Sequence, residues 1–207
     1  MKKQIYFISE NVNKYKELEK FLKQTEYVDN INLIMIKPDY ELNEIQSMDR
    51  NAIVSHKLID ACKESNRQLL NESNIENTEC WLLVEDTSFC IANIGNLPGP
   101  FIKYFLESMT LAQIARTNLL SPATSYVNFA IGKIHIEQST SNIITPIVFE
   151  GKVNGHIVEP RGQNGFGYDP IFKPIGSMKT NAEMTMTEKE EYNPRIRAFT
   201  EVLKYIK

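Results

Sequence analysis

Two adjacent carboxylates stand out as candidate chemistry in the middle of the chain. Glu85 and Asp86 follow the apolar run at 81–84. Carboxylates together with substrate phosphates are the ligands that Mg²⁺ prefers, and ligand sites of α/β sheets gather where strands end. The pair predicts a magnesium site, with Glu44 as a third candidate ligand. Neighbouring strand residues cannot both point inward, so the alternative for Glu85 and Asp86 is a polar strand terminus that meets solvent. The alternative for Glu44 is an acidic surface loop.

A polar segment near the amino terminus has the composition of an anion-binding site. Ser9, Asn11 and Lys14 follow the apolar run at 4–8 and open a predicted helix. Free backbone N–H groups at a helix start, joined by a hydroxyl, an amide and an ammonium group, suit a phosphate. Ordinary capping by Ser9 or Asn11, with a solvated lysine, explains the same residues.

An aromatic loop lies in the last quarter of the chain. Phe166 and Tyr168 flank Gly167, which predicts two rings on one side of an extended loop, where they could stack on a base. Asp169 is expected to accept hydrogen bonds from a purine edge, and the proline after it should hold it in extended geometry. The alternative is a glycine-rich turn whose rings pack on the core.

Two cations follow this loop. Asn193 and Pro194 form the N-cap and first-turn pair that starts a helix, so Arg195 lies in the first turn. A cation gains nothing from the helix dipole there, which indicates a carbonyl or anionic partner. Lys189, just upstream, could join it, and solvated surface charge is the alternative for each residue. Carboxylates, a phosphate-type helix start, an aromatic platform and cations together indicate a nucleoside polyphosphate bound with magnesium.

Composition narrows the class of protein. The 207 residues carry a net charge of −3 and are 42% hydrophobic, which is typical of a globular protein and argues against a nucleic-acid-binding surface. The sequence contains no Walker-type G-x-x-x-x-G-K-[ST] motif. The three cysteines form no C-x-x-C pair, and no apolar run is long enough for a signal peptide or membrane span. We therefore expect a cytoplasmic protein without a membrane partner.

Hydrophobic periodicity predicts a mixture of strands and helices, of class α/β or α+β, in one compact unit with two lobes. Strands are expected at 4–9, 31–36, 81–87, 126–138 and 146–158, the last two paired. Helices are expected after residue 11, at 48–70, after residue 101 and at the carboxyl terminus. Val12 and Leu18 in the first helix, and Ile59 in the second, are expected to face inward. The polar stretch at 66–80 is expected to be a surface excursion.

The chain resembles the inosine triphosphate pyrophosphatase family. The matching stretches are SENVNK, NEIQS, VEDTSFC, LPGPFIKYFLE, GHIVEPRG, FGYDPIF and AEM followed by EK and R-x-RAF. They occur in the family's order and span almost the whole chain. The resemblance implies an α/β fold with a mixed elongated sheet, flanking helices and two lobes around a central nucleotide-binding cleft. It also implies a homodimer that uses Mg²⁺, or Mn²⁺ in its place, to hydrolyse ITP, dITP and XTP to the monophosphate and pyrophosphate.

The resemblance assigns roles by position. It places Glu44 and Asp86 as metal ligands with Glu85 beside them, and Asp86 where water is activated, although base and ligand roles among the three stay open. The nucleotide-contacting positions are Ser9, Asn11, Lys14, Lys57, Thr87, Lys103, Phe166, Gly167, Tyr168, Asp169, Lys189 and Arg195.

One departure from the family pattern concerns the base. Where the family has Ser-His-Arg, this chain has Asn193, Pro194 and Arg195. Because proline offers no side-chain donor, a buried acceptor on the base would lose a partner, which costs about 1–3 kcal/mol, or roughly ten- to hundredfold in discrimination. The alternatives to ITP and XTP hydrolysis are therefore the same reaction with relaxed or altered base specificity, and a catalytically weak nucleotide-binding protein.

Overall fold

The computed structural model describes residues 2–38, 40, 42–69, 79–134 and 144–207, with side chains left out at 64–69. The strands are β1 (Lys3–Ile8), β2 (Ile31–Ile36), β3 (Cys80–Ile91), β4 (Leu97–Gly99), β5 (Pro122–Ile134), β6 (Ile147–Ile157) and β7 (Phe172–Pro174). The helices are α1 (Val12–Leu22), α2 (Arg50–Leu69), α3 (Ile102–Ser108), α4 (Leu111–Asn118), α5 (Met186–Glu190) and α6 (Pro194–Ile206), with short 3-10 turns at Ala92–Ile94, Asp169–Ile171 and Asn181–Glu183.

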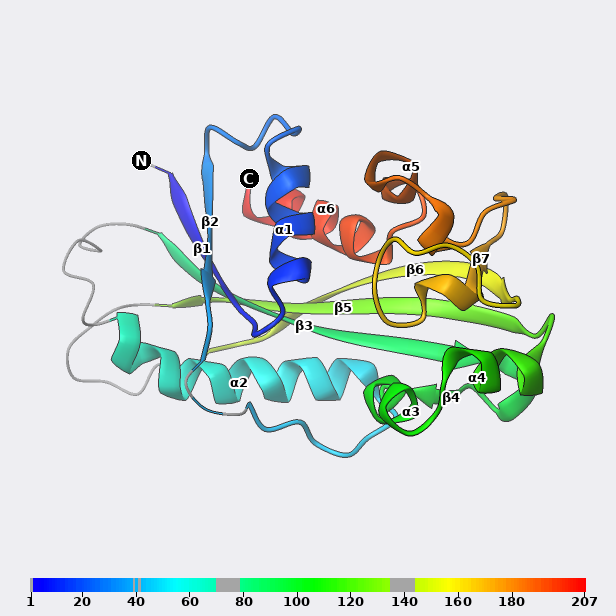
Figure 1. Cartoon of the computed structure of the whole chain (residues 1–207). Helices are drawn as coiled ribbons and strands as arrows, with labels where there is room; N and C mark the ends of the chain where they lie inside the picture. Colours follow the sequence, from blue (N-terminus) through cyan, green and yellow to red (C-terminus); the bar gives the residue numbers. More distant parts are fainter. Residues whose placement is uncertain (1, 39, 41, 70–78, 135–143) are drawn as a thin grey trace. The chain divides into compact units, whose positions relative to one another are not determined.

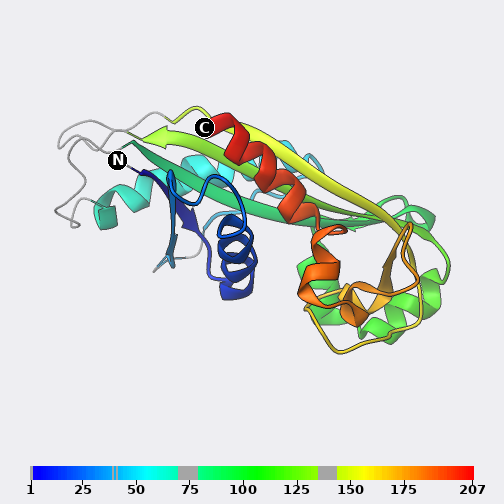
Figure 2. The ribbon, with the colours of Figure 1, turned by 90° about the horizontal axis from the view of Figure 1, so that it is seen from above.

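The strands form one mixed sheet, as expected for this fold class (Figures 1 and 2). Its order is β2-β1-β3-β5-β6-β7, and β4 pairs with β3. β1 runs parallel to β2 and to β3, whereas β3–β4 and β6–β7 are antiparallel. The neighbouring places of β5 and β6 confirm that these two long strands pair.

The chain divides into two compact units. The first unit contains residues 1–86, 128–149 and 199–207, and its core packs α2 against the sheet through residues such as Val54, Leu58, Leu82 and Ala130. The second contains residues 87–127 and 150–198. Its core is formed by residues that include Phe89, Ile114, Val153, Ile157 and Phe172. Each unit therefore has a hydrophobic core of its own.

The apolar face of α6 is confirmed, while two inward predictions in other helices are wrong. Ile196, Phe199 and Ile206 are buried. Leu18 is buried as predicted, but Val12 is 49% exposed because it is the first residue of α1, and Ile59 in α2 is 39% exposed. Of the excursion predicted at 66–80, residues 70–78 lie outside the described part of the chain.

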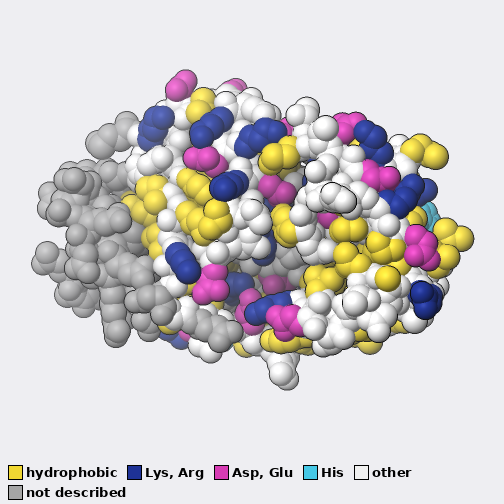
Figure 3. Space-filling model, in the orientation of Figure 1, with side chains coloured by type: hydrophobic (Ala, Val, Ile, Leu, Met, Phe, Trp, Pro, Cys, Tyr) yellow, Lys and Arg dark blue, Asp and Glu magenta, His cyan; other side chains and the backbone are white. Residues whose placement is uncertain are grey.

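The surface carries charges of both signs. Figure 3 shows acidic and basic side chains interspersed over one face, in keeping with a net charge of −3. Interspersed charge does not create the extended positive field that duplex nucleic acids require. Within the described residues, no helix is both long enough and apolar enough to cross a membrane.

Candidate active site

Both carboxylates of the Glu85–Asp86 pair are buried in β3, contrary to the expectation that only one could point inward. Glu85 is 3% exposed and Asp86 is 9% exposed. The strand does not end at these residues but continues to Ile91, between β1 and β5 in the sheet. Successive side chains still point to opposite faces of β3, but a central strand can be covered on both faces, so both positions can be buried.

The parallel register places this pair beside the end of β1. Phe7 is the partner of Leu83, and β1 ends at Ile8. Extending the register by two residues brings Ser9, which precedes α1, alongside Glu85. The carboxylates therefore lie where the loop after β1 begins, although β3 itself runs on.

Two lysines from two helices pair with carboxylates of the first unit. Lys14 Nζ, from the first turn of α1, lies 2.9 Å from Glu85 Oε1. Lys57 Nζ, from α2, lies 2.6 Å from Glu44 Oε1. Glu85 is the more deeply buried acceptor, and burying a carboxylate is costly unless it has such a partner. The structure thus pairs Lys14 with Glu85 and Lys57 with Glu44, and all four charges act on Asp86.

Asp86 differs from these paired carboxylates. Burial raises its pKa to about 6, an effect that the positive charges of Lys57 and Lys14 oppose and the negative charges of Glu44 and Glu85 reinforce. Its Oδ2 atom is buried and has no hydrogen-bond partner among the described residues. A buried carboxylate oxygen without a donor is costly, and such groups concentrate at functional sites.

The start of α1 is capped by its own side chains. Asn11 Oδ1 accepts hydrogen bonds from the N–H groups of Asn13 and Lys14, at 3.0 and 3.3 Å. Ser9 Oγ accepts from the Asn11 N–H at 3.1 Å. Capping by Ser9 and Asn11 is thus confirmed, but the expected solvated lysine is wrong, because the Lys14 ammonium group pairs with Glu85.

The first-unit residues fit a divalent cation. Among the described residues no group of three or more His, Cys, Asp or Glu side chains forms a cage. Mg²⁺ does not require one, because it keeps several waters and binds through one or two carboxylates plus substrate phosphates. Asp86 Oδ2 is a hard oxygen ligand that has no hydrogen-bond partner among the described residues. Glu44 and Glu85 lie close enough to Asp86 to influence its pKa.

In the second unit, two cations lie over the ring of Phe166. Lys189 Nζ is 5.2 Å and the Arg195 guanidinium carbon 5.8 Å from the centroid of its ring. Arg195 is only 4% exposed. Both distances are within the range of a cation–π contact, so the Phe166 ring is one partner of Arg195 in the first turn of α6.

Tyr168 does not share the surroundings of Phe166. Its ring stacks on Phe89 at 4.0 Å between centroids, and its hydroxyl is 2.7 Å from Ser125 Oγ. The expectation of an extended loop is wrong, because Gly167 has φ +62° and the chain continues into the 3-10 turn at Asp169–Ile171. Alternation of side chains requires extended backbone, so the two rings need not project together.

Asp169 is bound by other residues of the second unit. Its carboxylate accepts from the Phe166 N–H at 3.0 Å, from Lys189 Nζ at 2.9 Å and from Asn181 Nδ2 at 3.3 Å. Asn181 and Lys189 show no pattern with Asp169 in the sequence. Of the other predicted positions, Thr87 is partly buried in β3 and Lys103 is exposed on α3.

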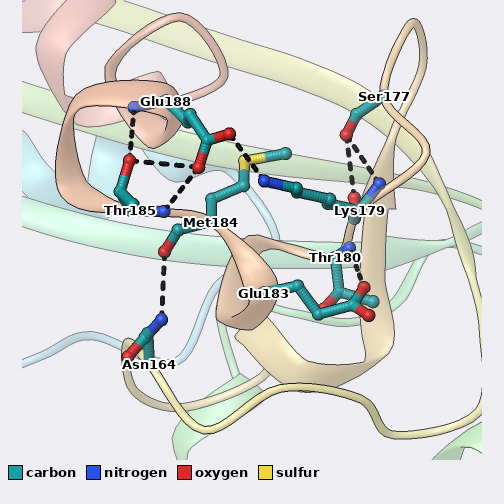
Figure 4. Close-up of polar contacts among 8 residues, drawn as sticks. All are labelled: Asn164, Ser177, Lys179, Thr180, Glu183, Met184, Thr185 and Glu188. Carbon is teal, nitrogen blue, oxygen red and sulfur yellow. Dashed lines mark hydrogen bonds and ion pairs between the residues drawn. The ribbon is translucent and has the colours of Figure 1, made fainter.

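Two capping boxes support the segment that carries Asn181 and Lys189 (Figure 4). Thr180 and Glu183 cap one turn, and Thr185 and Glu188 cap α5. Lys179 Nζ joins Glu188 at 2.6 Å. The spacing T-x-x-E is visible in the sequence for both turns, and it was the signal that could have located them.

The cap of α6 leads to a testable prediction. Asn193 Oδ1 accepts from the Arg195 N–H at 2.9 Å, which confirms the predicted N-cap. Replacing Asn193 by Ala should lower the free energy of unfolding by about 1 kcal/mol, because an N–H at the start of α6 loses its partner. Urea denaturation measures this change, and Asn193→Ser, which keeps an acceptor, should stay close to wild type. Equal losses in both variants would contradict the capping role.

A mixed α/β sheet with a lysine–carboxylate cluster at the end of a parallel strand is an arrangement suited to phosphate esters, and comparison with known proteins defines the family. The model of the Ham1 family matches residues 5–205. The chain is 32% identical over 204 residues to an inosine triphosphate pyrophosphatase of Candida glabrata, covering 98% of this chain and 97% of the relative. It is 30% identical over 207 residues to one of Kluyveromyces lactis, covering 99% and 96%.

A solved structure shares the fold of this chain. A Ham1 protein from Coxiella burnetii superposes with a TM-score of 0.72 at 23% identity, covering 99% of this chain and 98% of that one. The chain described here belongs to the Ham1 family, whose model matches it over residues 5–205. The resemblance seen in the sequence is confirmed, and so is the fold class.

Proposed function

We propose that this protein is a nucleoside triphosphate pyrophosphatase, which hydrolyses ITP, dITP and XTP to the monophosphate and pyrophosphate. The curated relatives named inosine triphosphate pyrophosphatase, at 30–32% identity over nearly the whole chain, support this reaction class. The observation that carries the proposal in this structure is Asp86. It is a buried carboxylate with an unpartnered oxygen, and it lies within electrostatic reach of two lysines and two further carboxylates.

Asp86 has the properties of a general base. An ordinary aspartate is a poor base at neutral pH, whereas one with a pKa near 6 is still ionised at pH 7.5 and accepts a proton more readily. In the proposed step a water attacks the α-phosphorus and gives its proton to Asp86. The bond from the α-phosphorus to the bridging oxygen breaks, and pyrophosphate leaves with the electron pair.

The lysines of the first unit suit the triphosphate. Lys14 and Lys57 are held beside Glu85 and Glu44, so their ammonium groups are positioned before a substrate arrives. Fixed cations stabilise the charge that develops on the leaving pyrophosphate without reorganising. We expect phosphate oxygens to take over part of the contact that each carboxylate now makes.

A divalent cation completes this proposal, with Glu44 and Asp86 as its protein ligands and Glu85 beside them. Mg²⁺, or Mn²⁺ in its place, would neutralise phosphate charge and polarise the phosphoryl oxygens when bound. The unpartnered Oδ2 of Asp86 supports this assignment.

We assign recognition of the nucleobase to residues of the second unit. The ring of Phe166 offers a stacking surface, and Lys189 and Arg195, within 5.2 and 5.8 Å of its centroid, offer N–H donors. Hydrogen-bond donors favour bases that carry keto oxygens, which hypoxanthine and xanthine do. Pro194, where the family pattern has histidine, supplies no further donor.

A substrate panel tests the proposal. Pyrophosphate release with Mg²⁺ would be measured for ITP, dITP, XTP, ATP, GTP, UTP and CTP. We expect the kcat/KM values for ITP, dITP and XTP to exceed that for ATP by at least about tenfold, because a site built of donors rejects an amino group in place of a keto oxygen. Comparable rates on all bases would indicate that Pro194 marks relaxed specificity. No release from any nucleotide by folded protein would contradict the enzymatic proposal.

We also propose an assembly state and a location for this protein. The family resemblance supports a homodimer in the cytoplasm. Light scattering coupled to size-exclusion chromatography would measure the molar mass, and a mass near that of one 23.8 kDa chain would contradict the dimer.

A further inference from the structure

Asp169 contacts Phe166 and Lys189, two of the residues that we propose to bind the nucleobase. Its side chain is buried, and its two oxygens accept three protein donors: Oδ2 takes the Phe166 N–H and Lys189 Nζ, and Oδ1 takes Asn181 Nδ2. An ionised carboxylate has about four acceptor sites, so most of its capacity is used inside the protein. This arrangement suits a group that fixes its neighbours more than one that reads a base.

The loop is wrapped closely around this carboxylate. Gly165 has φ +83°, and a Cβ atom added there would lie 2.2 Å from Asp169 Oδ2. Any side chain at position 165 would therefore collide with the carboxylate, and glycine also adopts this backbone conformation at no steric cost. The backbone approach is what allows the Phe166 N–H to reach Oδ2.

Asp169 Oδ2 also holds the Lys189 ammonium group over the Phe166 ring. Lys189 Nζ lies 2.9 Å from Asp169 Oδ2 and 5.2 Å from the Phe166 ring centroid. A lysine side chain has a flexible four-carbon stem, so its ammonium group needs an anchor to stay in one place. Asp169 thus sets both the backbone position of Phe166 and the place of the Lys189 ammonium group.

We propose that Asp169 is a positioning residue for nucleotide binding, which acts through Lys189 and Phe166 and not by contact with the base. This inference rests on the proposed function, and it assigns Asp169 a role different from the direct recognition expected from the sequence. It predicts that Asp169 matters only as long as the residues that it positions are present.

A double-mutant cycle tests this role. Asp169→Asn should raise the KM for ITP about tenfold with kcat nearly unchanged, because a charge-assisted contact is lost. In a Lys189→Met background the same change should raise KM by no more than about twofold, since coupled residues are not additive. Equal factors in both backgrounds would show that Asp169 acts independently of Lys189, as a direct base contact would, and would overturn the proposal.

A second variant moves the carboxylate without removing its charge. Gly165→Ala should displace Asp169 Oδ2 and raise KM in the same way as Asp169→Asn. Its matched control is Gly176→Ala, because Gly176 also has a positive φ, +91°, but an added Cβ would meet nothing closer than 3.6 Å. The control carries the backbone strain alone, so its KM should stay within about twofold of wild type. Equal KM values for both alanine variants would contradict the proposal even if Asp169→Asn fails to fold.

Separate values of kcat and KM, together with folding measurements, distinguish a positioning role from loss of structure and from failure of the proposed function. Circular dichroism and thermal unfolding would establish that each variant is folded at the assay temperature. A purely structural role would lower the active fraction, and hence kcat, while KM stayed constant, which would overturn the positioning role. If the proposed function were wrong, the wild-type protein itself would release no pyrophosphate from ITP.

Discussion

Asp86→Asn is expected to lower kcat for ITP hydrolysis by about 10²–10⁴-fold, the usual contribution of a positioned general base. Asparagine has nearly the same volume but cannot accept the proton of the attacking water, and its amide is a poor ligand for Mg²⁺. The fold should remain intact, because Asp86 Oδ2 makes no hydrogen bond in the described structure that asparagine would lose. Steady-state kinetics of pyrophosphate release, with circular dichroism on the same sample, measure both expectations.

A matched control shows whether the loss is specific to this carboxylate. Asp29 is an exposed aspartate just before β2, which begins beside Lys3 at the end of β1 opposite to Ile8, so Asp29→Asn removes a carboxylate away from the proposed chemistry. Its kcat should equal that of wild type. An Asp86→Asn variant with near-normal kcat would remove Asp86 from the mechanism, and Glu44 and Glu85 would become the candidates for the base.

Local patterns predicted most of the fold. β2 has the bounds expected from its apolar run, and α6 buries the face that its periodicity indicates. The prediction failed where a local rule met tertiary context. Glu85 and Asp86 were expected near the end of a strand at 81–87, but β3 continues past them to Ile91.

The reason for that failure is long-range pairing. Lys14 from α1 and Lys57 from α2 provide the charges that oppose the desolvation of Glu85 and Asp86. No spacing rule relates residues more than twenty positions apart, so burial of both carboxylates could not be predicted from the strand alone.

The second unit shows a similar limit. The aromatic–glycine–aromatic pattern was recognised, but its geometry depends on the positive φ of Gly165 and Gly167, which sequence alone does not give. The same holds for Asp169, whose partners Asn181 and Lys189 come from a later segment. Residue types alone could therefore suggest a nucleotide, whereas the proposal that Asp169 is a positioning residue needed the contacts that the structure shows.

Asp86 should also lower the stability of the protein, and the cost should depend on pH. Its pKa is about 6 in the folded state against 3.8 ordinarily, so between these values the folded state binds the proton more tightly than the unfolded state. The contribution of Asp86 to stability is therefore greatest below about pH 4 and falls as pH rises to about 6, by linkage. Asp86→Asn removes this titration, and above pH 7 without metal it should be more stable than wild type by about 1–3 kcal/mol.

Urea denaturation from pH 4.5 to 8 in the presence of EDTA measures the difference between the two proteins, which cancels every other group that titrates. The difference should grow with pH up to about 6 and then stay constant.

Adding Mg²⁺ should raise the unfolding free energy of wild type but not of Asp86→Asn, because a ligand that binds only the folded state stabilises it by mass action. A difference that is flat with pH would mean that Asp86 is not desolvated in solution. An equal response of both proteins to Mg²⁺ would place the metal at other residues. The gain in stability expected from losing this carboxylate is the energetic counterpart of its proposed role, since burial both raises the free energy of the folded protein and makes Asp86 basic enough to take a proton from water.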